Sequence, residues 1–176
     1  MEAVSILEKE LDSRVVVRFQ DCDPFGHLNN VRYIDYFMNA REDQLLDYYD
    51  FDLFGHTENS GNGWVVSKNQ IAYLYPARMK EEVLIRTRLI HRTERTLVVE
   101  GVMYDTDERQ IKAVMWVEFT YINVKSGRPG SHEPELMALF DAVVIEDLYD
   151  GDTSFSARAS ELRSESRVRR RETAAA

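Results

Sequence analysis

A single long helical pattern precedes four long β-patterned segments, and this order most strongly constrains the fold. Over residues 31–49, Val31, Ile34, Met38 and Leu45 fall within about 60° of one another at 100° per residue, which predicts one amphipathic helix. The β-patterned segments cover residues 64–75, 82–91, 97–105 and 110–123. Because their connections are short, neighbouring strands are expected to be antiparallel. The order predicts an α+β fold in which one long helix packs against an antiparallel sheet.

Three further segments complete the expected element order. Residues 14–20 are rich in β-branched and aromatic residues and predict a first strand, which brings the sheet to about five strands. Residues 51–63 include a Gly- and Asn-rich stretch and predict a loop, and residues 134–142 predict a short helix. One helix covers only one face of a sheet, so the other face and a sheet edge predict oligomerisation.

One residue interrupts the apolar stripe of the long helix. Glu42 lies at the same helical angle as the apolar side chains. A helix packed on a sheet can hold this carboxylate beside Arg41 or at an exposed end, and the sequence leaves both arrangements open.

Composition excludes several classes of protein. The 176 residues carry 22 basic and 31 acidic side chains, a net charge of −9 that argues against nucleic acid as the main partner. No apolar run is long enough to insert into a membrane, and residues 1–20 lack the pattern of a secretory signal. Cys22 is the only cysteine, which excludes an intramolecular disulfide and fits a reducing compartment. These features predict a cytoplasmic protein.

The end of the chain differs in composition from the rest. Residues 156–176 contain six arginines and three glutamates but only two large apolar residues, Leu162 and Val168. We therefore expect one domain over residues 1–150, followed by a charged and flexible tail over residues 151–176. Removal of this tail is expected to leave thermal stability nearly unchanged.

The chemistry is expected between the first strand and the long helix. There the carboxylates of Asp21 and Asp23 are followed by Gly26, His27 and the helix start. The backbone N–H groups of a helix start are unpaired and can stabilise negative charge on a carbonyl oxygen. A nearby carboxylate can attack that carbonyl carbon or deprotonate a water molecule. The same residue types also serve as helix caps and turn formers, so the pattern alone leaves both roles open.

The stretch RFQDCDPFGHLNNVRYIDYFMNAR resembles the signature of hotdog-fold thioesterases of the hydroxybenzoyl-CoA thioesterase type. It also resembles acyl-carrier-protein thioesterases, which place His four residues after the catalytic Asp and follow it with Asn-Asn. The resemblance is close over about 24 residues and continues loosely in the strand order to about residue 125. It implies a hotdog fold, a long central helix wrapped by an antiparallel sheet. It further implies an oligomeric thioesterase of fatty acid metabolism that acts on acyl-CoA or acyl-carrier-protein thioesters without a cofactor.

The resemblance assigns the catalytic groups. The family's carboxylate corresponds to Asp23, as general base or nucleophile, and its oxyanion contact to a backbone N–H at or near Asn30. The histidine of the acyl-carrier-protein enzymes corresponds to His27, which either orients water and polarises the carbonyl or caps the loop. Phe25 stands where those enzymes carry an asparagine, so their full Asp-Asn-His arrangement is not reproduced.

Five further residues are expected to bind substrate, each with a structural alternative. Gly26 and Asn29 lie in the motif, where Asn29 can instead cap the helix. The family's tyrosine at Tyr33 lies near the acyl pocket, although packing of the helix explains it equally. Arg92 and Arg95 flank a strand turn where related enzymes place cations for the coenzyme A phosphates; solvated turn arginines are the alternative. No histidine, cysteine or carboxylate set has zinc spacing, so no metal is expected.

Three rival hypotheses remain open at this point. A non-catalytic hotdog module would bind acyl thioesters without using Asp23. A dehydratase or hydratase would pair a histidine with a differently placed carboxylate. A Cys22 nucleophile assisted by His27 is the third, but neighbours on an extended segment face opposite sides, so only one of Cys22 and Asp23 faces the site.

Overall fold

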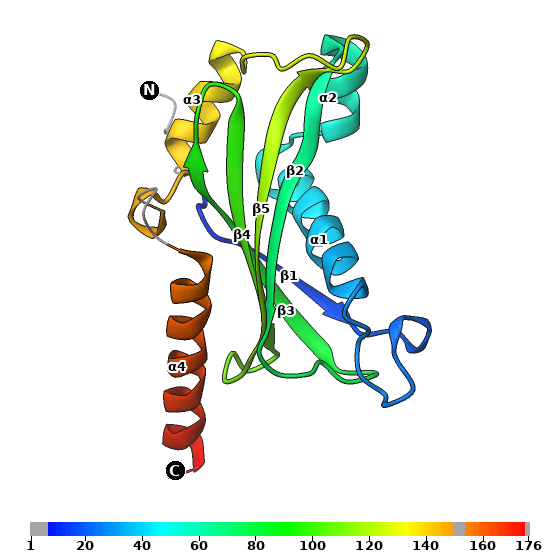
Figure 1. The fold of residues 1–176 in the computed structure, drawn as a ribbon, viewed down its shortest axis with the longest axis vertical. Helices are drawn as coiled ribbons and strands as arrows, with labels where there is room; N and C mark the ends of the chain where they lie inside the picture. Colours follow the sequence, from blue (N-terminus) through cyan, green and yellow to red (C-terminus); the bar gives the residue numbers. More distant parts are fainter. Residues whose placement is uncertain (1–6, 150–153, 175–176) are drawn as a thin grey trace, which may run out of the picture.

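A five-stranded antiparallel sheet forms the centre of the computed structural model, which describes residues 7–149 and 154–174 (Figure 1). The strands are β1 (Leu11–Val16), β2 (Asn62–Tyr73), β3 (Glu82–Arg92), β4 (Thr96–Asp105) and β5 (Ile111–Asn123). Their order across the sheet is β1-β3-β4-β5-β2, and every neighbouring pair is antiparallel. The predicted α+β architecture and all four long strands are therefore confirmed.

The long helix α1 (Arg32–Tyr49) lies against one face of this sheet, as predicted. Side chains from its buried side meet alternate residues of the central strands, including Ile85, Met103 and Met115. The approach is close because β4 carries Gly101 opposite the ring of Phe37. A Cβ atom at residue 101 would lie 2.6 Å from Phe37 Cδ1, which no real packing allows.

We expect Gly101→Ala to lower the free energy of unfolding by about 1–3 kcal/mol, because the added methyl group forces α1 away from the sheet. Urea unfolding of the variant and the wild type measures this difference. Gly130→Ala is the matched control, since its Cβ would meet Tyr121 at an ordinary 3.7 Å. Equal losses in the two variants would show that the close approach of α1 is not responsible.

Two local predictions were wrong. The expected loop over 51–63 contains a helix, α2 (Leu53–Ser60), whose first turn is capped by Asp52 through a 2.9 Å bond from the Phe54 N–H. Gly61 ends the helix with a left-handed φ of 72°. The first strand stops at Val16, and a 3₁₀ turn, η1 (Phe19–Asp21), replaces its expected end. The short helix α3 (Pro134–Val143) is present as predicted, and a second 3₁₀ turn, η2 (Glu146–Leu148), follows it.

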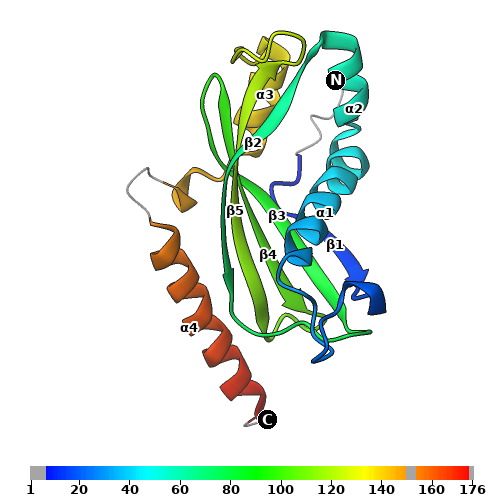
Figure 2. The same ribbon diagram turned by 45° about the vertical axis from the view of Figure 1, so that its right-hand side comes forward.

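The C-terminal segment, expected as a charged and flexible tail, has regular structure over most of its length. Residues Phe155–Ala174 form a helix, α4, that runs along the sheet face opposite α1 (Figure 2). Leu162 is 2% exposed and packs among outer-face side chains such as Val102 and Ile111. Two large apolar residues cannot form a core by themselves, but Leu162 packs against apolar side chains that the sheet already presents. The expected domain boundary near residue 150 lies outside the described residues.

A buried ion cluster joins α4 to the sheet. Glu100 on β4 is fully buried and accepts bonds from Arg158 Nε of α4 at 3.0 Å and from Arg88 Nη2 of β3 at 2.7 Å. Trp116 Nε1 donates a third bond to it at 2.7 Å. Burial alone would raise the pKa of Glu100, but the Arg158 bond and the charges of both arginines hold that pKa below its ordinary value. The outer face is therefore covered by the chain itself where α4 lies.

Candidate active site

The motif predicted to carry the chemistry folds into a loop that closes on itself. The Asp23 N–H donates to the His27 carbonyl at 2.8 Å, and Cys22 pairs with Leu28 in an isolated β-bridge. Gly26 forms the tip of this loop with a φ of 73°, a conformation that favours glycine. The loop is anchored on the segment before β3, because Leu28 N–H donates to the Ala77 carbonyl at 2.8 Å.

The Asp23 carboxylate is fixed by the loop's own backbone. Its Oδ1 accepts bonds from the N–H groups of Phe25 at 2.9 Å and His27 at 3.1 Å. Its other oxygen, Oδ2, accepts no bond from any residue that the structure describes, and the side chain is partly exposed. Asp23 is therefore oriented while one oxygen remains available to a reactant. His27 takes part through its backbone, which supports the loop-capping alternative.

The start of α1 leaves the backbone donor of Asn30 unused. Asn29 acts as a cap, because its Oδ1 accepts the Val31 N–H at 3.2 Å and its carbonyl accepts the Arg32 N–H at 2.8 Å. The Asn30 carbonyl is held at 2.8 Å by the hydroxyl of Tyr73. Within residues 7–149 and 154–174, no acceptor is found for the Asn30 N–H. The predicted oxyanion contact thus lies on a fixed turn with its donor free.

Neighbouring motif residues support the loop. The Tyr36 hydroxyl donates to Asp21 Oδ2 at 2.9 Å and accepts the Arg18 N–H at 3.1 Å, which ties the loop to α1. Cys22 donates its thiol to the Arg18 carbonyl at 3.3 Å. Burial first, and then the charges of Asp21 and Asp23, raise the pKa of the Cys22 thiol. A raised pKa keeps the thiol protonated and argues against the cysteine-nucleophile hypothesis.

Of the remaining predicted binding residues, Tyr33 lies beneath the Asp23 loop, whereas the two arginines lie far from it. Tyr33 is only 2% exposed, and its hydroxyl accepts the Ala77 N–H at 3.0 Å, so it anchors the loop from within the core. Arg92 ends β3 and Arg95 lies in the turn between β3 and β4, at the opposite end of the molecule from the motif loop (Figure 1). There Arg92 forms an ion pair with Asp141 of α3. Within one subunit these arginines do not reach the Asp23 site.

Comparison with known proteins decides the family. The family described as thioesterase-like superfamily matches residues 17–140, well over half of the chain. This chain belongs to the thioesterase-like superfamily. The predicted family is therefore confirmed, and with it the predicted class of enzyme, a thioester hydrolase.

Individual relatives of this superfamily member agree in sequence and in fold. The long-chain acyl-CoA thioesterase FadM of Escherichia coli is 25% identical over 134 residues, which cover 76% of this chain and 99% of that protein. The crystal structure of YbaW, a probable thioesterase from Escherichia coli, superposes with a TM-score of 0.66 at 24% identity, over 77% of this chain and 99% of that one. A DHNA-CoA thioesterase from Staphylococcus aureus superposes with a TM-score of 0.67 at 16% identity, over 76% and 87% of the two chains. The predicted hotdog fold is confirmed.

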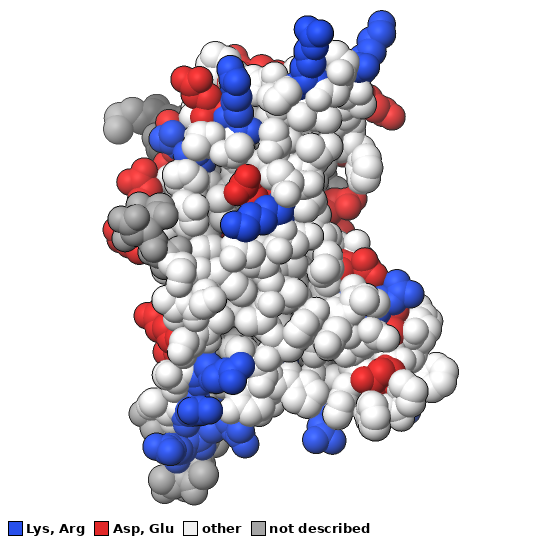
Figure 3. All heavy atoms as spheres, viewed as in Figure 1, with Lys and Arg blue, Asp and Glu red and all other residues white. Residues whose placement is uncertain are grey.

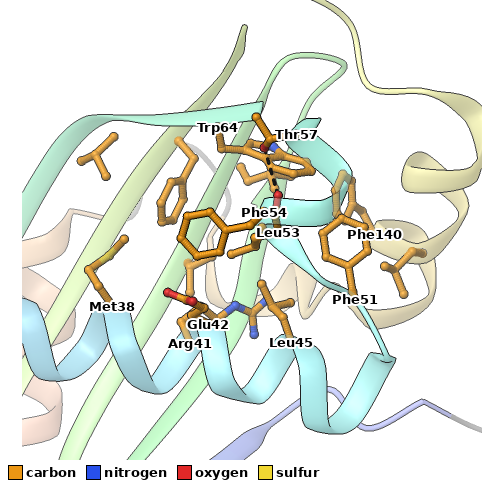
Figure 4. A pocket seen from close by; sticks show the side chains of 15 residues that line it. Met38, Arg41, Glu42, Leu45, Phe51, Leu53, Phe54, Thr57, Trp64 and Phe140 are labelled. Atoms are coloured by element: carbon orange, nitrogen blue, oxygen red, sulfur yellow. Dashed lines mark hydrogen bonds between the residues drawn. The ribbon is translucent and has the colours of Figure 1, made fainter. Parts of the chain in front are cut away.

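An apolar cavity of about 290 Å³ lies further along the central helix of this superfamily member (Figure 4). It lies between α1, α2, α3 and the inner face of the sheet and is open to solvent on one side, and five aromatic rings line it: Phe51, Phe54, Trp64, Phe119 and Phe140. Two charged side chains, Arg41 and Glu42, also line it. Sequence patterns did not predict this cavity, although the position of Glu42 on the apolar stripe was a signal of it.

The described residues show two further absences. No group of three or more His, Cys, Asp or Glu side chains lies close enough to hold a metal ion in these parts of the chain. Among the same residues, no helix has the length and hydropathy needed to span a bilayer.

Proposed function

We propose that this chain is an acyl-CoA thioesterase that uses Asp23 and the Asn30 N–H as its catalytic groups. The observation that carries the proposal is the pairing, in one loop, of an oriented carboxylate with one free oxygen and an unused backbone donor at a helix start. A thioester needs these two functions, a base or nucleophile for the carbon and a donor for the oxygen. The named relatives, which act on coenzyme A thioesters, support this choice of substrate.

The reaction follows from the two groups. Asp23 removes a proton from water, whose oxygen bonds to the thioester carbon, and the carbonyl oxygen becomes an oxyanion. The Asn30 N–H, with the positive end of the α1 dipole behind it, stabilises that oxyanion. Collapse breaks the C–S bond, and the proton held by Asp23 passes to the departing thiolate. Direct attack by Asp23 through an anhydride, which water then hydrolyses, uses the same geometry.

The other motif residues position these groups. Gly26 gives the loop its tip, the His27 backbone orients the Asp23 carboxylate, and Asn29 fixes the turn that presents the Asn30 donor. We assign Tyr33 the same positioning role, since its hydroxyl anchors the segment on which the loop rests. None of these roles requires contact with substrate.

Two exposed cations beside the loop suit the phosphates of coenzyme A. Arg78 pairs with His27 in an isolated β-bridge, and Lys80 follows it on the same exposed segment. We expect Arg78→Ala to raise KM for an acyl-CoA by roughly three- to tenfold, because an exposed charge-assisted phosphate contact is lost. Steady-state kinetics measures this change, with the matching acyl-pantetheine, which lacks the nucleotide phosphates, as control. If Arg95→Ala raises KM instead, the phosphates lie at the β3–β4 turn as the sequence predicted.

We further propose a cytoplasmic homo-oligomer, either a dimer or a tetramer. Strand β2 is an edge strand of twelve residues whose outer side pairs with no strand that the structure describes, and Val65 and Val66 on it are exposed. A long edge with exposed apolar side chains favours pairing with a second copy. Because α4 already covers part of the outer face of the sheet, the β2 edge is the better surface for contact with a second copy of the chain. The lone Cys22 fits a reducing compartment.

Release of free thiol from a panel of thioesters tests the proposed function. The panel contains short, medium and long aliphatic acyl-CoAs, an aromatic acyl-CoA and an acyl-carrier-protein thioester. Turnover of the coenzyme A members supports the proposal. Turnover of the carrier-protein member alone would show that the substrate is a thioester of acyl-carrier protein and not of coenzyme A. Absence of turnover on every member, with acyl-CoA still raising the melting temperature, would identify a non-catalytic binding module. Hydration of an enoyl-CoA without thiol release would identify a hydratase.

A further inference from the structure

The cavity beside α1 contains a cation that lacks an acidic partner. Arg41 donates from Nη1 to Thr87 Oγ1 at 3.1 Å, and no carboxylate in the described parts of the chain lies within ion-pair distance of it. Burial lowers the pKa of Arg41 to about 10, with a smaller opposing effect from Tyr49, so the group is charged at neutral pH. Arg41 is partly buried, and a partly buried cation without a carboxylate partner in a mostly apolar cavity favours a ligand oxygen.

A polar chain under the helix holds Arg41 in place. Thr87 accepts the Arg41 bond and donates its own hydroxyl to Gln44. Gln44 is fully buried and donates to Ser13 Oγ and to the Ile85 carbonyl, each at 3.1 Å. Each member of this chain is satisfied, so the chain orients Arg41 and leaves the remaining guanidinium N–H groups for a ligand. A group held this rigidly is suited to discriminate between ligands.

Glu42 supplies an acceptor on the same side of the cavity. Its side chain is exposed and rises from α1 beside that of Arg41, opposite the rings of Phe51 and Phe54 (Figure 4). Among the lining residues, Arg41 and Glu42 are the only charged ones, so the charges of the cavity sum to zero. An anionic ligand group would be attracted by one and repelled by the other. A neutral group that both accepts and donates satisfies the two together.

We propose that this cavity binds the distal part of an acyl chain that carries a hydroxyl group, with Arg41 donating a hydrogen bond to its oxygen and Glu42 accepting a hydrogen bond from its O–H. The proposal rests on the proposed thioesterase function and names the substrate class. The cavity lies about 10–15 Å along α1 from the helix start, given 1.5 Å per residue between residue 31 and residues 38–41. The thioester end at Asn30 and the distal hydroxyl at Arg41 are therefore separate contacts of one extended chain. The aromatic rings of the cavity pack against the carbons of the chain that lie beside Arg41.

Matched acyl-CoA pairs test the proposal. Chains from hexanoyl to hexadecanoyl are compared with and without a terminal hydroxyl, and the ratio of kcat/KM within each pair is the readout. At the chain length that reaches Arg41, we expect the wild type to favour the hydroxylated member by about tenfold or more, the discrimination that a hydrogen bond to a charged group provides. Arg41→Met is expected to abolish this ratio, whereas Met38→Leu, which alters the same cavity without removing a charge, keeps it. A variant that is partly unfolded loses kcat/KM equally for the hydroxylated and the plain acyl-CoA, so the ratio within the pair does not change.

A binding arm separates failure of this proposal from failure of the proposed function. Calorimetric Kd values of the free hydroxylated and plain fatty acids for the wild type and Arg41→Met require no turnover. Preference for the hydroxylated acid that disappears in the variant supports the site even if no thioester is hydrolysed. Equal ratios in the wild type and Arg41→Met, or a wild-type preference for the plain or terminally carboxylated chain, would overturn the proposal while leaving the thioesterase function intact.

Discussion

Asp23→Asn is expected to lower kcat for acyl-CoA hydrolysis by about 10²–10⁴-fold, or about 3–5 kcal/mol of activation free energy, the usual loss on removing a general base. The asparagine keeps an oxygen that can accept the N–H groups of Phe25 and His27, so the loop is expected to stay folded. It loses the second carboxylate oxygen, which is the one left free for water. Thiol-release assays at saturating acyl-CoA measure the change, and unfolding curves confirm that the variant is intact.

Two matched variants show that the loss belongs to Asp23. Cys22→Ala removes the neighbouring thiol, whose pKa is raised, and is expected to retain activity. Asp35→Asn removes an exposed carboxylate on the first turn of α1, where it pairs with Arg32 at 2.9 Å. The Asp35→Asn variant tests whether removal of any carboxylate near the helix start lowers kcat. Unchanged turnover in Asp23→Asn would remove this carboxylate from the mechanism, and a large loss in Cys22→Ala would return the thiol to it.

The fold was predictable where local periodicity and tertiary packing agree. The β-patterned segments and the amphipathic helix predicted that a helix packs on the sheet, and Met103 and Met115 of the sheet do meet α1. The prediction failed where packing overrides composition. Helix α4 has a polar sequence around Leu162, and only the sheet's outer face, which the segment itself does not encode, makes the helix stable.

The candidate site was predictable in sequence position but only partly in geometry. A motif places Asp23 and Asn30 in one loop, and the structure adds which carboxylate oxygen and which N–H remain free. Arg92 and Arg95 were assigned by analogy of position along the chain, yet the β3–β4 turn projects to the other end of the sheet. The cavity is lined by residues from three helices and the sheet, which are far apart in the sequence, so no local pattern predicts it. Glu42 on the apolar stripe of α1 was its one signal in the sequence.

The contacts of α4 with the sheet lead us to expect that the C-terminal segment contributes to stability, in contrast to the expectation from the sequence. Arginine side chains gather on the lower part of α4 (Figure 3), but Arg158 at its upper end points inward to Glu100. We expect Glu100→Ala to lower the free energy of unfolding by about 3–5 kcal/mol, because Arg88 and Arg158 lose their shared buried partner and keep only the partly exposed carboxylates of Glu10 and Glu161. For a chain of this size, that loss corresponds to a fall in melting temperature of roughly 6–20 °C. Thermal and urea unfolding both measure it.

Comparison of Glu100 with Glu161 isolates the effect of burial. Both carboxylates bind Arg158, but the Glu161 side chain is 59% exposed, so Glu161→Ala is expected to cost less than about 1 kcal/mol. Because the Glu100 pKa is held below its ordinary value, the carboxylate contributes its full stability above that ordinary value. The contribution is lost as pH falls through the lowered pKa, so the difference between wild type and Glu100→Ala is expected to shrink only in strong acid. A difference below about 1 kcal/mol at neutral pH would show that the ion cluster does not hold α4, and that its apolar contacts around Leu162 do so alone.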